Sequence, residues 1–70
     1  MAEYTVILEK GEKGWGAYVP DLPGCIATGR TRALAERRIR EAIPLHIAFL
    51  REYGDAVPEP SSESVRVNVA

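Results

Sequence analysis

The residues with the greatest potential for covalent chemistry are one cysteine and one histidine, Cys25 and His46. A thiol beside an imidazole can form the thiolate–imidazolium pair that activates cysteine nucleophiles. The surrounding sequence favours a plainer interpretation, because Cys25 falls in a short strand-like stretch and His46 in the apolar stripe of a helix. A single cysteine on a strand usually packs as a small buried hydrophobe. We therefore expect no catalytic residue, and we expect that the protein is not an enzyme.

The acidic and glycine-rich patterns do not assemble a metal or phosphate site. Glu9 and Asp21 are the carboxylates nearest the predicted strands, and two isolated acids fall short of the converging set that two-metal chemistry needs. Asp21 is typical of a turn residue that hydrogen-bonds its own backbone. Gly11, Gly14 and Gly16 lack the Lys-Ser/Thr pair and the helix that follow a phosphate-binding loop. We expect no metal and no cofactor.

Three arginines, Arg37, Arg38 and Arg40, are the candidates for contact with nucleic acid. Guanidinium groups bind phosphates, and the aromatic rings of Trp15 and Tyr18 can stack on bases. Glutamates flank the arginines, so a solvated, salt-bridged helix face is the competing interpretation. A nucleic-acid-binding module therefore stays open as an alternative function.

Composition limits what a chain of 70 residues can do. Lys plus Arg is 9 against 10 Asp plus Glu, so the chain has no overall basic field of the kind that dedicated DNA binders carry. A hydrophobic fraction of 46% and a charged fraction of 27% are typical of a soluble globular protein, and the length predicts one domain over residues 1–70. No apolar run is long enough for a membrane span, and the start lacks the features of a signal peptide. We expect a cytoplasmic protein without membrane contact.

The short chain also limits stability. Ordering a small domain costs roughly 1.5 kcal/mol per residue, and burial in so small a chain offsets this only narrowly. The single Cys25 excludes an internal disulfide. Association of identical chains is the usual remaining support, so we expect a homo-oligomer, either a dimer or a tetramer.

Three short segments rich in β-branched and aromatic residues predict strands, at 3–9, 15–19 and 25–29. A charged, glycine-bearing turn at 10–14 joins the first two, and a loop at 20–24 with two prolines joins the last two. Side chains alternate along a strand, so one face of this sheet points away from the core. Thr5, Ile7 and Tyr18 fall on that second face, which is either exposed or a surface for a partner.

A long amphipathic helix is predicted from Arg32 to Tyr53. Thr31 can serve as its N-cap and Gly54 as its C-terminal stop. Pro44 lies inside and predicts a kink or a division into two helices. Oppositely charged residues at i,i+4 spacing predict ion pairs, namely Arg32/Glu36, Glu36/Arg40 and Arg37/Glu41. The predicted apolar stripe consists of Ala35, Ile39, Ala42, Ile43, His46, Phe49, Leu50 and Tyr53.

The last part of the chain predicts one more strand. After an extended connector at 55–62, valine alternates with polar residues from 65 to 69. The order of elements is then β-β-β-α-β. This order predicts a two-layer α+β domain in which one helix packs on a mostly antiparallel sheet.

The segment Tyr18-Val19-Pro20-Asp21-Leu22-Pro23-Gly24-Cys25 carries the resemblance to a known family. The chain resembles the HicB-like family, the small antitoxin-type domains of HicA/HicB toxin–antitoxin systems. The likeness extends over most of the chain, and its further pieces, in order, are Thr28-Gly29, Thr31, Ala42-Ile43, Leu45-His46, Leu50, Gly54 and Val57-Pro58-Glu59-Pro60.

The resemblance implies a β-β-β-α-β domain similar to a partial RNase H fold without its catalytic carboxylates. It also implies a role, because such antitoxins bind a small HicA-like toxin that cleaves mRNA and cover its active site. Domains of this kind form dimers or higher oligomers. If the chain acts in this way, we expect the partner to contact Tyr18, Pro20, Asp21, Leu22 and Pro23.

The chain also departs from the family pattern. Many members carry a C-terminal helix-turn-helix or ribbon-helix-helix segment, whereas this sequence ends directly after its last predicted strand, so direct DNA binding is not expected. The family often has acidic residues at the positions of Arg30, Arg32 and Ala33. An oligomeric HicB-like domain without a toxin partner therefore stays open as an alternative.

Overall fold

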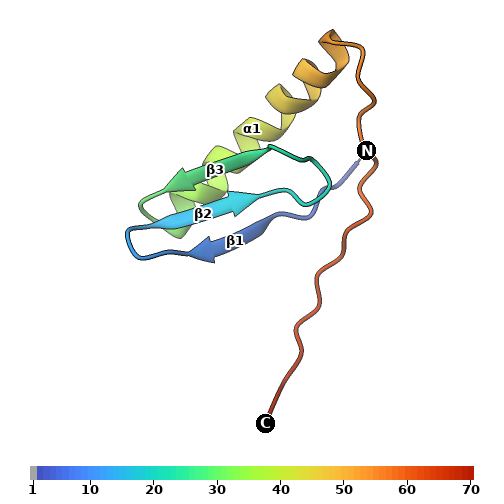
Figure 1. The fold of residues 1–70 in the computed structure, drawn as a ribbon. Helices are drawn as coiled ribbons and strands as arrows, with labels where there is room; N and C mark the ends of the chain where they lie inside the picture. Colours follow the sequence, from blue (N-terminus) through green and yellow to red (C-terminus); the bar gives the residue numbers. More distant parts are fainter. Residues whose placement is uncertain (1) are drawn as a thin grey trace.

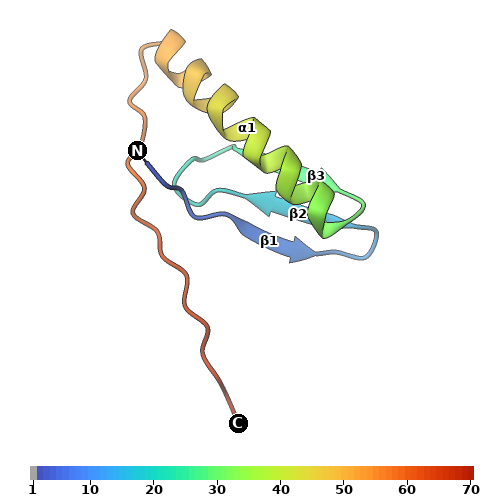
Figure 2. The same cartoon turned by 180° about the vertical axis from the view of Figure 1, so that it is seen from behind.

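The structure, a computed structural model, describes residues 2–70 and contains a three-stranded sheet and one helix (Figure 1). The strands are β1 (Ile7–Lys10), β2 (Trp15–Tyr18) and β3 (Ile26–Gly29), and the helix is α1 (Arg32–Glu52). The strands are antiparallel in the order β1-β2-β3, and α1 packs on one face of the sheet (Figures 1 and 2). The predicted α+β class is confirmed.

The core is formed where the inner face of the sheet meets the first half of α1. Side-chain alternation places Ala17 of β2 and Val19, directly after β2, inward, and both are buried. Ala35 and Ile39 of α1 pack against them. Tyr4, Val6 and Leu8, which alternate along the chain, lie half-buried at the margin of this core. The buried residues of the core are Ala17, Val19, Leu22, Cys25, Ala35 and Ile39.

Gly29 allows the sheet and the helix to approach at backbone distance. A Cβ at this position would lie 2.6 Å from the backbone nitrogen of Ala35 and 3.0 Å from the carbonyl carbon of Leu34. Only a residue without a side chain fits at such a distance. The end of β3 and the start of α1 are therefore held together by backbone contact rather than by interdigitating side chains.

The helix begins and ends as its sequence predicts. The Thr31 hydroxyl accepts a hydrogen bond from the Leu34 amide at 3.1 Å, and Gly54 adopts a left-handed φ of +72° after the last turn. Pro44 lies inside α1, which continues through it as one element, so the predicted division into two helices is wrong. All three predicted ion pairs form, with distances of 3.0 Å for Arg32–Glu36, 3.0 Å for Arg40–Glu36 and 3.9 Å for Arg37–Glu41.

The second half of α1 extends past the sheet. A helix of 21 residues is roughly 31 Å long, whereas a strand of 4 residues spans roughly 13 Å. The helix therefore has no sheet beneath its last turns. Phe49 is 54% exposed and Tyr53 is 67% exposed, so this end of the predicted apolar stripe faces solvent instead of the core. Their rings pack against each other in a tilted arrangement, with centroids 4.7 Å apart and planes at 42°.

The predicted last strand does not form. Residues 55–70 contain no strand, and the chain leaves the domain as an extended segment beyond β1 (Figures 1 and 2). Val65, Val67 and Val69 are 83%, 73% and 81% exposed. Alternation predicted the extended conformation of this segment, but a strand also needs a neighbouring strand, and the path of the chain brings none beside it.

Asp21 anchors the connector that leads to this segment. Its two carboxylate oxygens accept hydrogen bonds from the amides of Ser61 and Ser62 at 3.0 and 2.9 Å, and from the two hydroxyls at 3.1 and 2.9 Å. We call these four bonds the Asp21 clasp. Thr5 and Tyr4 add bonds from their hydroxyls to the carbonyls of Ser62 and Pro58. The backbone amides of Ser62 and Ser61 lower the pKa of Asp21 from 3.8 to about 2.

Replacing Gly29 by alanine tests the close approach of β3 to α1. The new methyl group collides with backbone that cannot move independently, so Gly29→Ala should destabilise the fold by about 1–3 kcal/mol in urea unfolding. The control is Gly16→Ala, because a Cβ at Gly16 meets no described atom within 4 Å. Equal stability of the two variants would show that the approach of β3 to α1 leaves room for a side chain at position 29.

The Asp21 clasp predicts a specific dependence on pH. The pKa of Asp21 in the folded state lies below its ordinary value of 3.8. The clasp therefore contributes its full stabilisation of the fold above about pH 4, and this stabilisation is lost as the pH falls through about 2. Amide resonances of Ser61 and Ser62 should therefore titrate near pH 2. In Asp21→Asn, hydrogen exchange at these two amides should rise towards that of unstructured chain while exchange in α1 is unchanged. A midpoint near pH 4 would contradict the clasp.

Candidate functional site

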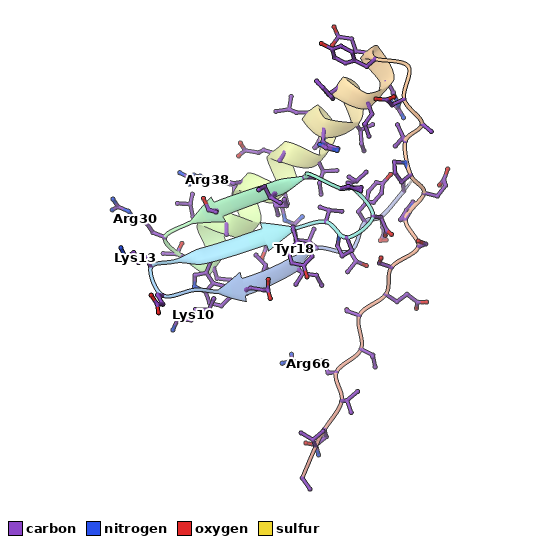
Figure 3. All side chains as sticks on the ribbon, in the orientation of Figure 1. Lys10, Lys13, Tyr18, Arg30, Arg38 and Arg66 are labelled. Carbon is purple, nitrogen blue, oxygen red and sulfur yellow. The ribbon has the colours of Figure 1, made fainter. Side chains whose placement is uncertain are left out.

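The face of the sheet opposite α1 carries a row of apolar side chains. The strand register aligns Ile7 with Tyr18 and Tyr18 with Ile26, so the three residues form one line across β1, β2 and β3. Tyr18 is 39% exposed and Ile26 is 69% exposed. Figure 3 shows Tyr18 on β2 with α1 behind the sheet. We call these three residues the apolar row, and the face that carries them is the uncovered face that the sequence predicted.

The loop between β2 and β3 is built around its own backbone hydrogen bonds. The amides of Leu22 and Cys25 donate to the carbonyls of Val19 and Leu22, both at 3.0 Å, and the Val19 amide donates to the Cys25 carbonyl at 3.2 Å. Gly24 has a left-handed φ of +87°, which glycine adopts without steric cost. Val19, Leu22 and Cys25 point into the core, so the loop has a fixed shape beside the apolar row.

The structure separates the five predicted contact residues into three groups. Tyr18, Pro20 and Pro23 are exposed, and their surfaces are free to meet a partner. Asp21 is engaged in the clasp with the connector. Leu22 has 0% exposure, so its side chain anchors the loop from inside and offers no contact surface. The sequence could not show this burial, because it depends on how the loop folds back over the core.

The predicted arginine cluster on α1 is divided among contacts within the chain. Arg37 pairs with Glu41, and Arg40 pairs with Glu36 through two nitrogens at 3.1 and 3.0 Å. Arg38 donates to the Thr28 carbonyl of β3 at 2.9 Å. The Arg40 guanidinium, followed by that of Arg32, holds the pKa of the Glu36 carboxyl below its usual range. The three arginines therefore do not form one free basic surface.

A different basic surface lies at the hairpin end of the sheet, and sequence inspection missed it. A groove of about 670 Å³ there is lined by backbone of Gly14, Gly16 and Gly29 and by the Trp15 side chain, among others. Figure 3 shows cationic side chains around it, contributed by Lys10, Lys13, Arg30 and Arg38. These cations lie between positions 10 and 38 of the sequence. The pairing of Lys10 with Trp15 and of Trp15 with Gly29 brings the strand ends together, and the bond from Arg38 to the Thr28 carbonyl adds the helix.

Cys25 and His46 are placed close to the same loop but are not joined. Cys25 is 3% exposed, and burial raises the pKa of its thiol, which disfavours the thiolate that a nucleophile needs. His46 lies near the loop, because a Cβ placed on Gly24 would be 3.8 Å from its Cε1. Among the hydrogen bonds of residues 2–70, none connects Cys25 with His46.

Two further features of the described chain bear on its chemistry. Within residues 2–70, no group of three or more His, Cys, Asp or Glu side chains is arranged to hold a metal ion. The long helix α1 lacks the apolar length that crossing a membrane requires, and it is the only helix in that range.

Proteins similar to this chain occur in an archaeon, a cyanobacterium and a phage. The UPF0150 protein Ta0767 of Thermoplasma acidophilum is 37% identical over 67 residues, which cover 94% of this chain and 97% of that protein. The UPF0150 protein ssr1765 of Synechocystis is 42% identical over 57 residues, covering 80% and 72%. An uncharacterized 14.9 kDa protein of Haemophilus phage HP1 is 32% identical over 65 residues, and the chain spans 49% of its length.

A family model also matches the chain over almost its whole length. The model is described as the HicB_like antitoxin of bacterial toxin-antitoxin system, and it matches residues 4–69. This range includes the three strands, the structured β2–β3 loop, α1 and the clasped connector. The agreement between this match and the full-length similarity to Ta0767 assigns the chain to the HicB-like antitoxin family.

Proposed function

We propose that this chain is an antitoxin that neutralises a small mRNA-cleaving toxin by covering its active site. The observation that carries the proposal is the apolar row on the uncovered face of the sheet, in a chain of this family. Contiguous exposed apolar surface bordered by polar residues is typical of a protein-binding site. Tyr18 and Ile26 provide the most exposed apolar area of the row.

The loop beside the row supports the same assignment. Pro20 and Pro23 stand exposed on a loop whose shape is held by backbone bonds and by three buried side chains. A surface that is already rigid loses little conformational entropy when it binds. The row and these two prolines together are the candidate surface for the toxin.

The proposed action is occlusion rather than turnover. The buried Cys25 thiol with its raised pKa and the self-paired charges of α1 offer little chemistry to a substrate. We propose that residues 1–70 act as one domain in the cytoplasm, where mRNA is the target of the toxin. Self-association into a dimer or tetramer is part of the proposal, because so few side chains are buried in one copy.

A second candidate function is binding of RNA phosphates in the basic groove. The observation that favours it is the gathering of four cationic side chains around a groove that contains a tryptophan. Cations that track a backbone and an aromatic ring that stacks on a base are the usual parts of a single-strand binding site. A HicB-like oligomer that has no toxin partner would be compatible with this second function.

The antitoxin proposal is tested by expressing a candidate toxin, such as any small basic protein found in a neighbouring reading frame, and assaying it for RNA cleavage in vitro. Wild-type protein should inhibit cleavage, and Ile26→Lys should weaken inhibition by roughly tenfold or more, because a charge replaces a central apolar contact. Leu45→Lys is the matched control, since Leu45 is 71% exposed on α1 and Ile26 is 69% exposed on the sheet. Equal inhibition by both variants would exclude the uncovered face, and no inhibition by wild type would exclude this toxin.

The RNA-binding candidate is tested with a fluorescently labelled single-stranded RNA. If the groove binds phosphates, affinity should fall steeply with salt, and the double variant Lys13→Glu/Arg30→Glu should abolish binding. Arg37→Glu is the control, because Arg37 pairs with Glu41 away from the groove and should leave binding nearly unchanged. Binding that is insensitive to salt, or equally lost in the control, would remove this second function.

A further inference from the structure

The inner side of β1 is only partly covered by α1. The helix packs most extensively against β3 and least against β1. A groove of about 350 Å³ consequently opens between β1 and α1. Its lining is mostly apolar and includes one ion pair; it comprises Tyr4, Val6, Leu8, Ile39, Ile43 and the pair Glu36–Arg40. We call this the β1 groove.

The two edges of the sheet differ in how they are protected. On β3, the Arg38 guanidinium donates to the Thr28 carbonyl at 2.9 Å, which occupies part of the backbone of that strand. On β1, no strand pairs with the outer edge anywhere in residues 2–70, and the β1 groove lies directly beside it. An open edge strand is a template for the addition of another strand. The β1 edge is therefore the place where the sheet can grow.

The chain itself contains a segment suited to that edge. From Glu63 to Val69 it is extended and amphipathic, with three exposed valines on one side and Arg66 and Asn68 on the other. The Asp21 clasp fixes Ser61 and Ser62, and the segment then projects away from the sheet and from α1 (Figures 1 and 2). Three large aliphatic side chains are thus mostly exposed to solvent.

We propose that the segment Glu63–Val69 of one copy adds as a strand to the β1 edge of a second copy, reciprocally. The valines then enter the β1 groove beside Val6 and Leu8 of the partner copy. Alternation places Arg66 on the opposite face, which is the face that carries Glu9 next to the apolar row. This match of apolar with apolar and of Arg66 with Glu9 holds whichever way the added strand runs.

A second copy is the occupant that the geometry favours. To reach its own β1 edge, the chain would have to turn sharply after Ser62, whose amide and hydroxyl are both held by the clasp. Exchange between two copies needs no such turn. In a dimer with a twofold axis, the segment of each copy occupies the β1 groove of the other, so both grooves are filled. This inference specifies how the proposed self-association forms and rests on that part of the proposed function.

The first test measures mass by sedimentation. Wild type should be a dimer, and Val67→Lys should be monomeric with the same helical circular dichroism, because Val67 is 73% exposed and supports nothing within its own copy. Leu45→Lys is the control and should remain a dimer, since Leu45 is equally exposed on α1. A monomeric wild type would overturn self-association altogether, whereas a dimeric Val67→Lys would overturn only the strand exchange.

The second test separates exchange between copies from pairing within one. Glu9→Arg and Arg66→Glu should each weaken the dimer by roughly tenfold, because each places like charges together twice. When the two variants are mixed, each interface again joins opposite charges, so native mass spectrometry should show heterodimers above the statistical share. Absence of this excess would overturn the exchange. The toxin-inhibition assay with Ile26→Lys is independent of this outcome, so failure of the two proposals can be distinguished.

Discussion

The backbone contact between Gly29 and the first turn of α1 determines most of what the molecule exposes. It places the start of the helix directly against β3. The rest of the helix then packs less extensively against β1 than against β3. One consequence is the apolar groove between β1 and α1. Another is that the last turns of α1 extend past the short strands, so Phe49 and Tyr53 face solvent. The surfaces available to partners thus follow from where one glycine permits close packing.

Asp21 links the loop beside the candidate binding face to the distant connector. Its position between two prolines predicts a turn residue, and the structure uses its carboxylate to hold Ser61 and Ser62 instead. The loop needs no side-chain support of its own, because its backbone bonds and the buried Leu22 already hold it. The carboxylate is therefore available to bind Ser61 and Ser62, and these bonds fix where the chain runs after residue 60. An exposed loop and an exposed segment are in this way tied to one rigid core.

Charge is distributed unevenly in a chain whose net charge is only −1. On α1, glutamates and arginines neutralise one another at i,i+4 spacing, so the most arginine-rich stretch presents little free positive potential. At the hairpin end of the sheet, cations from separate elements surround one groove. Counting charges along the sequence directs attention to the helix, whereas their positions in space direct it to the hairpin.

The local features of this protein could be predicted from its sequence, because each depends on residues only a few positions apart. Strand alternation, the hairpin turn, the Thr31 cap, the left-handed Gly54 after the helix and the helical ion pairs are of this kind. The family resemblance rested on an ordered set of such local pieces. Only tertiary structure decided that Leu22 is buried, that the segment from 63 to 69 lies beside no strand, and that Lys10 and Arg30 share a groove. Those outcomes depend on contacts between residues far apart in the chain, and hydrophobic periodicity carries no information about which distant elements meet.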